Sequence, residues 1–383
     1  MNGERIIVAP DSFKGSLTAA QVAQACRLGI LDELPTAEVV CLPLADGGEG
    51  TVDALSESAR MSKVKCKVCD PLMRLIEAVY AISSDGKNAV MEMAAASGLT
   101  LLSESERDPM QTSTYGTGEM ILDALRRGCR RFFIGIGGSA TNDGGMGMLR
   151  ALGYRFADAS GNPLEGRGSD LSRVVRIDVS GADPRLRESS FTVACDVGNP
   201  LFGPNGAAFV FAPQKGADEE TVMQLDRGLR DFASVIMRDI GVDVSLMPGA
   251  GAAGGLGAAF CAFLGADLRK GIEMVLEAVG FDRAIAGASL IFTGEGSVDA
   301  QSLMGKVVSG VSSHAREAGV PVVVLGGKVA DRVALAKAGL TALPVVSGPM
   351  SLPQAMRPEV AQANVRDTAG AVMRLLHIGK EMT

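Results

Sequence analysis

Short apolar runs alternate with amphipathic segments near the start of the chain. Residues 6–9 form an apolar run that Pro10 ends, which predicts a buried strand. Thr18 and Gln21 then have the spacing of a capping box, and apolar residues recur at helical spacing up to Ile30. A strand predicted over residues 38–44 completes a β-α-β unit, so we expect a parallel pair with a right-handed crossover.

The same order of strand and polar loop recurs along the chain. Apolar runs at 131–136, 191–195 and 290–292 each lead into a glycine-rich or polar loop, and runs at 320–325 and 341–346 follow; a helix is predicted over 52–58. Residues 64–93 alternate instead, with a turn at 84–87, and predict an antiparallel hairpin. We therefore predict an α/β fold in which residues 1–62 and 285–383 form one five-stranded doubly wound sheet, and residues 63–284 form an inserted second α/β domain.

Composition narrows the class of protein. The 383 residues are 47% hydrophobic, which is enough for two cores, and a net charge of −7 without a basic run argues against a nucleic-acid partner. Seven scattered cysteines fit a reducing cytoplasm, and only four apolar residues follow Arg5, so no signal peptide is expected. The uncharged stretch between Asp243 and Asp267 is rich in glycine and alanine and contains Pro248, so we interpret it as a loop before a packed helix rather than a membrane span.

Carboxylates follow several of the predicted strands. These are Asp11, Asp46, Asp143, Asp196 and Glu295. Ligands of parallel α/β sheets bind beyond the carboxyl ends of strands, where glycine and helix N-termini can hold phosphate and carboxylates can hold Mg²⁺ or accept a proton. The pattern predicts phosphoryl transfer, although any one aspartate could instead be a helix cap or an Asx turn. Glu295 and Asp299 would share a face if their segment were helical, and a bound cation would relieve their repulsion; a solvated loop is the alternative.

Other motifs in the sequence are weaker evidence for a function. Residues 135–140 and 249–254 match dinucleotide fingerprints without the required context, and Lys306 and Lys328 are each followed by Val, so no Walker motif is present. Lys14 lies three residues past Asp11, where it could contact a phosphate or a substrate carboxylate, or simply be solvated. The two histidines occur in helical, charged surroundings, and Cys66 and Cys69 would point to opposite faces of a strand.

Several longer blocks, in order, resemble the bacterial glycerate kinase family. The blocks are VAPDSFKGSL (8–17), ADGGEGT (45–51), EMAAASGL (92–99), GGSATNDGGMG (137–147), NPLFGP (199–204) and FTGEGSVD (292–299). The resemblance implies ATP-dependent phosphorylation of D-glycerate at the 2-hydroxyl to give 2-phosphoglycerate and ADP, and a discontinuous flavodoxin-like domain around an inserted domain.

The resemblance also suggests roles for individual residues. The hypothetical catalytic set is Asp11, Lys14, Asp46, Glu49 and Asp196, with Asp46 or Asp11 accepting the hydroxyl proton. The hypothetical nucleotide-binding set is Gly137, Gly138, Ser139, Asn142, Asp143, Gly254, Gly255 and Lys306. Mg²⁺ would be held by carboxylates among Asp196, Glu295 and Asp299. A kinase for another small hydroxy or sugar acid and a non-catalytic nucleotide-binding sensor remain alternatives, and both a monomer and a homo-oligomer remain open.

Overall fold

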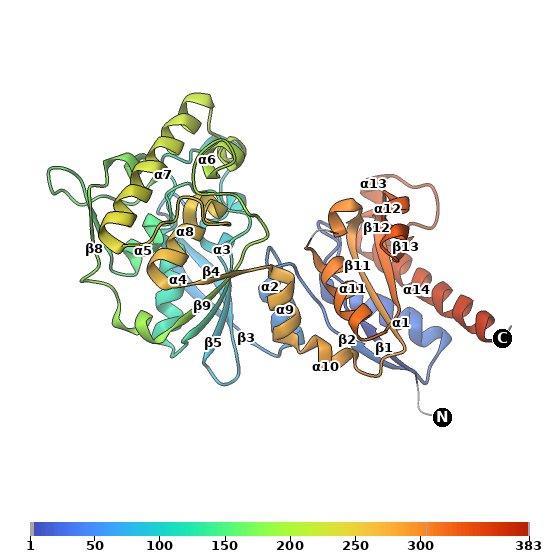
Figure 1. Ribbon diagram of the computed structural model, residues 1–383. Helices are drawn as coiled ribbons and strands as arrows, with labels where there is room; N and C mark the ends of the chain where they lie inside the picture. The colour runs from blue at the N-terminus through green and yellow to red at the C-terminus, as the bar shows by residue number, and fades with distance from the viewer. Residues whose placement is uncertain (1–3, 304, 382–383) are drawn as a thin grey trace. The chain divides into compact units, whose positions relative to one another are not determined.

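The computed structural model describes residues 4–303 and 305–381, and the chain divides into two compact units (Figure 1). Unit 1 comprises residues 1–46, 53–60 and 272–383, and unit 2 comprises residues 47–52 and 61–271. The fold is a mixed α/β fold, as the sequence predicts, and both ends of the chain contribute to unit 1.

The elements of unit 1 come from the two ends of the chain, and two of its helices, α2 and α9, begin in residues of unit 2. They are β1 (Arg5–Val8), α1 (Ala19–Glu33), β2 (Glu38–Cys41), α2 (Thr51–Ser58), α9 (Gly271–Val279), α10 (Phe281–Ile285), β11 (Leu290–Val298), α11 (Val307–Glu317), β12 (Val322–Val329), α12 (Arg332–Lys337), β13 (Thr341–Pro344), α13 (Leu352–Ala355) and α14 (Pro358–Glu381).

Unit 1 is built on a five-stranded sheet with the strand order β13-β12-β11-β1-β2. Every neighbouring pair is parallel, so the predicted crossover pair and the predicted five-stranded sheet are both confirmed. Thr18 caps α1 through the predicted capping box with Gln21. The sheet is covered on two faces: Val323 and Leu325 pack in the cluster that contains α1 and α14, whereas Val324 packs with α11 and α12.

The elements of unit 2 form one mixed sheet, a small two-stranded sheet and the surrounding helices. They are β3 (Ser62–Cys69), β4 (Leu75–Ile82), β5 (Asn88–Glu92), α3 (Ala94–Ser97), α4 (Tyr115–Arg126), β6 (Arg131–Gly135), α5 (Met146–Ala151), β7 (Arg155–Ala157), β8 (Arg176–Asp178), β9 (Ser190–Ala194), α6 (Ala207–Phe211), α7 (Glu219–Ile240), α8 (Ala252–Leu264) and β10 (Asp267–Arg269).

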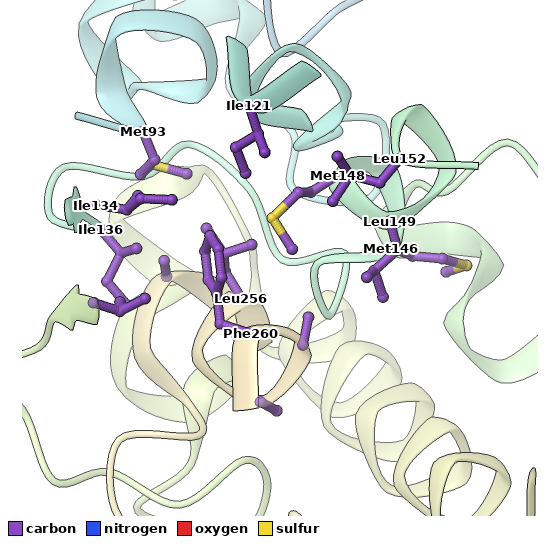
Figure 2. Close-up of a cluster of buried hydrophobic side chains, with 14 of the residues drawn as sticks. Met93, Ile121, Ile134, Ile136, Met146, Met148, Leu149, Leu152, Leu256 and Phe260 are labelled. Carbon is purple, nitrogen blue, oxygen red and sulfur yellow. The ribbon is translucent and has the colours of Figure 1, made fainter. Parts of the chain in front are cut away.

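The main sheet of unit 2 has six strands in the order β10-β9-β6-β5-β4-β3. Its β3-β4-β5 part is antiparallel, which confirms the hairpin predicted between residues 64 and 93, and the remaining pairs are parallel. Figure 2 shows the core on this sheet, where Leu256 and Phe260 of α8 lie against Ile134 of β6 and Met148 of α5. The helix α8 occupies the uncharged stretch, and among the described residues no helix is long and apolar enough to cross a membrane.

The boundaries of the units differ from those predicted from the sequence. The last change of unit along the chain falls between Gly271 and Ile272 rather than at 284/285, because Ile272 packs closely on Gly310 of α11. The short segment 47–52 belongs to unit 2, since the N–H of Val52 donates to Glu92 Oε1 at 2.8 Å and Gly47 packs tightly on Gly135. None of these three long-range contacts has a signature in the local sequence.

Candidate active site

A cavity of about 580 Å³ opens at the carboxyl ends of the strands of unit 1. Its charged lining consists of Asp11, Lys14, Asp46, Glu295, Lys306 and Lys328. These residues follow or end four of the five parallel strands, which is where doubly wound sheets bind their ligands. The sheet therefore brings together five residues that the sequence predicts for the site: Asp11, Lys14, Asp46, Glu295 and Lys306. It adds Lys328 of β12, for which the sequence predicts no role.

The Asp11 carboxyl group lies just past β1 and is 6% exposed. The N–H of Ser12 donates to its Oδ1 at 2.6 Å, which fixes the side chain at the start of the loop. Burial, followed by the negative charge of Asp46, raises the pKa of Asp11 to about 7, although the Ser12 hydrogen bond and Lys14 oppose this rise. A carboxyl group with a pKa near 7 can exchange a proton with a substrate hydroxyl at neutral pH.

Glu295 lies inside a strand and not in a loop or helix. β11 continues through Val298 because its pairing with β12 extends along residues 291–298, so the segment is not helical and Glu295 and Asp299 share no helical face. Glu295 is 8% exposed, and its Oε1 is buried without a hydrogen-bond partner. Burial raises the pKa of Glu295 above its usual range, while the Ser302 hydrogen bond and the charge of Lys306 oppose that shift.

The cavity also has apolar lining residues. It is lined by Val345, Val346, Met350, Leu352, Met356 and Ala361, which come from the chain after β13 and from α13 and α14. A cavity lined by both charged and apolar side chains suits a small molecule that carries both charge and apolar surface.

The predicted phosphate loop between β6 and α5 belongs to unit 2. Gly137 and Gly138 are exposed, whereas Ser139, Asn142 and Asp143 are buried. Gly254 and Gly255 pack against this loop in left-handed conformations, and a Cβ atom at Gly254 would lie 2.1 Å from the Thr141 carbonyl oxygen. The glycines at 254 and 255 thus permit α8 to approach the loop closely.

The Asp143 carboxylate is turned into the protein. It accepts hydrogen bonds from the Thr114 N–H and hydroxyl, both at 2.7 Å, and from the N–H groups of Gly145 and Gly147 at 3.0 and 3.1 Å. Burial raises the pKa of Asp143, and these four hydrogen bonds oppose the shift. Its observed contacts tie the starts of α4 and α5 together and do not point to a nucleotide.

Lys215 was missed by sequence reasoning. It is 1% exposed, and its Nζ donates to Ser139 Oγ at 2.8 Å and to the Thr141 carbonyl oxygen at 2.6 Å. Burial lowers the pKa of Lys215 to about 7, and the nearby charge of Asp143 opposes the shift. Lys215 is separated by 76 residues from Ser139, so nothing in the local sequence links the two.

The remaining predicted residues lie elsewhere. Asp196 follows β9 in unit 2, where its Oδ1 accepts a hydrogen bond from the N–H of Gly271 at 3.1 Å, and Glu49 is exposed in the 47–52 segment. Asp196 thus belongs to a different unit from Glu295 and Asp299. Across residues 4–303 and 305–381, no three metal-ligating side chains form a cluster.

A doubly wound parallel sheet with carboxylates and lysines around a cavity at its carboxyl edge defines an α/β enzyme that acts on a small anionic ligand. The profile of the glycerate kinase family matches residues 6–377, and the chain belongs to that family.

Proteins similar to the chain carry the same description. A glycerate 2-kinase of Escherichia coli K12 is 49% identical over 329 residues, which are 86% of each chain. A glycerate kinase of Bacillus cereus is 44% identical over 98% of this chain and 99% of its own length. A solved structure described as glycerate kinase 2 from Salmonella typhimurium LT2 superposes with a TM-score of 0.89 at 43% identity, covering 99% of this chain and all of that one.

Proposed function

We propose that the protein transfers the γ-phosphoryl group of ATP to the 2-hydroxyl of D-glycerate, giving 2-phosphoglycerate and ADP. Family membership supports glycerate as the acceptor, and the relative named glycerate 2-kinase supports the 2-position. The observation that carries the proposal is the Asp11 carboxyl group in the unit 1 cavity, which lysines also line, with a pKa of about 7.

Asp11 accepts the hydroxyl proton as the oxygen of the acceptor attacks the γ-phosphorus. The new bond forms between that oxygen and phosphorus, and the bond to the bridging oxygen breaks, so that ADP leaves with the electron pair. Such transfers pass through a loose transition state, in which the protein mainly positions groups and stabilises charge. Asp11 is chosen over Asp46 because its side chain is the more buried of the two.

The lysines of the cavity provide the positive charge that anionic substrates require. Lys14 lies on the loop that carries Asp11, and Lys306 lies at the N-cap of α11 near Glu295. We assign Lys14 to the carboxylate of glycerate or the transferring phosphoryl group, and Lys306 to the phosphates of the nucleotide. An ammonium group serves as a compact point charge in such contacts.

Mg²⁺ fits the residues of unit 1. The buried Oε1 of Glu295 has no hydrogen-bond partner among the residues that the structure describes, and Asp299 lies near enough to influence the pKa of Glu295. Mg²⁺ is usually held by one or two carboxylates together with the substrate phosphates, so Glu295 and Asp299 would suffice and a three-residue cluster is not required. The ion would neutralise charge on the phosphate oxygens of ATP.

Three further assignments belong to this proposal. Gly137, Gly138, Ser139, Asn142, Gly254 and Gly255 contribute to phosphate binding, and Asp196 and Glu49 keep their predicted roles near the substrates. We also place the reaction in the cytoplasm, which the seven free cysteines support.

The test is a turnover assay with ATP, Mg²⁺ and D-glycerate in which the product is coupled directly to enolase. We expect a signal without added phosphoglycerate mutase, because enolase consumes 2-phosphoglycerate. A signal that appears only when the mutase is added would show that the 3-hydroxyl is phosphorylated instead. Formation of ADP with a different small hydroxy acid but not with D-glycerate would overturn the substrate assignment, and no ADP with any acceptor would favour a nucleotide-binding sensor.

A further inference from the structure

Lys215 is an uncommon residue to find buried without an acidic partner. Among the described residues no carboxylate lies in direct contact with it: Asp143 acts only through its nearby charge, and the ammonium group donates hydrogen bonds to Ser139 Oγ and the Thr141 carbonyl oxygen. Burying an unpaired charge is costly, and the lowered pKa of Lys215 reflects that cost. A neutral side chain could hold the loop by hydrogen bonds at a smaller desolvation cost. The presence of an amine at this position therefore requires another explanation.

The loop that Lys215 holds has unsatisfied polar groups. Thr141 Oγ1 and both side-chain polar atoms of Asn142 are buried without a hydrogen-bond partner, and both residues are 0% exposed. Leaving such groups unpaired costs stability, and proteins accept that cost mainly where a ligand or an ordered water completes the site. The neighbouring Gly137 and Gly138 are exposed, so the same loop also reaches solvent.

The hydrogen-bond direction at Ser139 is informative. An ammonium group has three donors and no acceptor, so Ser139 Oγ must accept from Lys215 Nζ. The hydroxyl hydrogen of Ser139 is then turned away from Lys215. Its oxygen is polarised by the ammonium group, which makes the hydroxyl a better donor to an anionic oxygen beside the exposed Gly137–Gly138 turn.

We propose that Lys215 is a positioning residue of an oxyanion site on the loop of residues 137–142, where it turns the Ser139 hydroxyl outward and supplies the positive charge behind it. The ligand is an oxyanion, namely the phosphate chain of the nucleotide or the carboxylate of the acceptor. The choice between these two rests on the function proposed above, whereas the site itself does not.

The test compares Lys215→Met, Lys215→Gln and Ser139→Ala with the exposed Lys67→Met of β3 as the matched control. Circular dichroism and thermal melting first establish that each variant is folded. Calorimetry then measures binding of ADP, inorganic tripolyphosphate and D-glycerate separately, at pH 6 and at pH 8.5.

We expect Lys215→Met to weaken ADP and tripolyphosphate at least tenfold at pH 6 and to leave D-glycerate unchanged, with Lys67→Met like the wild type. The difference in affinity between the wild type and Lys215→Met should be smaller at pH 8.5, where the amine is neutral. A residue that only supports the loop would give no such pH dependence. Ser139→Ala should weaken binding of the same ligands. The double variant Lys215→Met/Ser139→Ala should bind them no more weakly than Lys215→Met alone. In turnover, the KM for ATP should rise more than kcat falls.

If Lys215→Met and Ser139→Ala lose affinity for D-glycerate alone, the oxyanion is the carboxylate of the acceptor. Unchanged affinity of Lys215→Gln and Ser139→Ala for all three ligands would overturn the proposal, even if Lys215→Met does not fold. A wild-type protein that binds tripolyphosphate but does not phosphorylate glycerate would contradict the proposed function while leaving this site intact.

Discussion

The chemistry of unit 1 depends on how burial and neighbouring charge act on single carboxyl groups. Asp11 and Glu295 are both buried and line the same cavity, and burial is the largest cause of the raised pKa of each. Asp46 contributes to both shifts through its negative charge. The two carboxyl groups thus suit different roles. Asp11 suits proton transfer near neutral pH, whereas the Oε1 of Glu295, which has no hydrogen-bond partner among the described residues, suits binding of a cation.

Asp11→Asn should lower kcat by about 10²–10⁴-fold, the usual contribution of a general base, while the KM for D-glycerate changes little. In the wild type, the acidic limb of the kcat/KM profile should lie near pH 7. Asp46→Asn should shift that limb to lower pH, because removing a neighbouring negative charge stabilises ionised Asp11. Steady-state kinetics from pH 5 to 9 measure both effects, and near-normal turnover of Asp11→Asn would exclude it as the base.

At the scale of elements, α1 and α14 pair closely even though they come from opposite ends of the chain. Gly29 of α1 lies against the backbone of α14, where a Cβ atom would be 2.0 Å from the Arg366 carbonyl oxygen. Arg366 bonds Asp32 through two nitrogens at 2.6 and 2.8 Å, and Arg374 pairs with Glu33. The Arg366 hydrogen bond lowers the pKa of Asp32. The glycine permits the approach, and the ion pairs align the helices.

Gly29→Ala should therefore destabilise the protein by about 1–3 kcal/mol, the usual cost of overpacking, even though alanine is the better helix former. The matched control is Gly379→Ala in α14, where nothing lies within 4 Å of the added Cβ. That control should leave stability unchanged or raise it by at most about 1 kcal/mol. Urea denaturation followed by circular dichroism measures both, and equal stability of the two variants would contradict close packing at Gly29.

At the scale of the whole molecule, the chain passes from unit 2 into unit 1 at the start of α9, and one histidine of α11 bonds both α9 and the next helix, α10. His314 of α11 bonds Asp282 of α10 at 2.6 Å through Nδ1 and Glu273 of α9 at 3.1 Å through Nε2. Burial alone would lower the pKa of His314, but these two carboxylates raise it above its ordinary value. The prediction of histidines in helical, charged surroundings is confirmed for His314, whose partners lie 32 and 41 residues away.

A raised folded-state pKa means that the stabilisation from protonated His314 is fully present below about pH 6.5, its unfolded pKa, and is lost as pH rises through the folded pKa. The difference in unfolding free energy between wild type and His314→Gln should thus be largest near pH 6 and smaller at pH 8. Comparing the two at each pH cancels the titration of Asp11 and Lys215, and the exposed His377→Gln serves as control. A difference independent of pH between 6 and 8 would contradict the ion pairs.

The sequence by itself determined the features that depend on neighbours along the chain. The capping box of Thr18 and Gln21, the short buried strands, the antiparallel hairpin and the order of the carboxylates were all predicted correctly, because local sterics, hydrogen bonds and hydrophobic period decide them. The ordered blocks also identified the family, since several long segments in register rarely coincide by chance.

Only the tertiary structure decided the features that depend on distant contacts. Pairing with β12 keeps Glu295 inside a strand, packing of Ile272 on Gly310 moves the unit boundary, and the fold buries Lys215 beside a loop 76 residues away. The pKa values of Asp11 and Lys215 belong to the same class, because desolvation arises only when the chain has closed around them. A sequence specifies which groups are available, whereas burial and long-range pairing determine their charge and their partners.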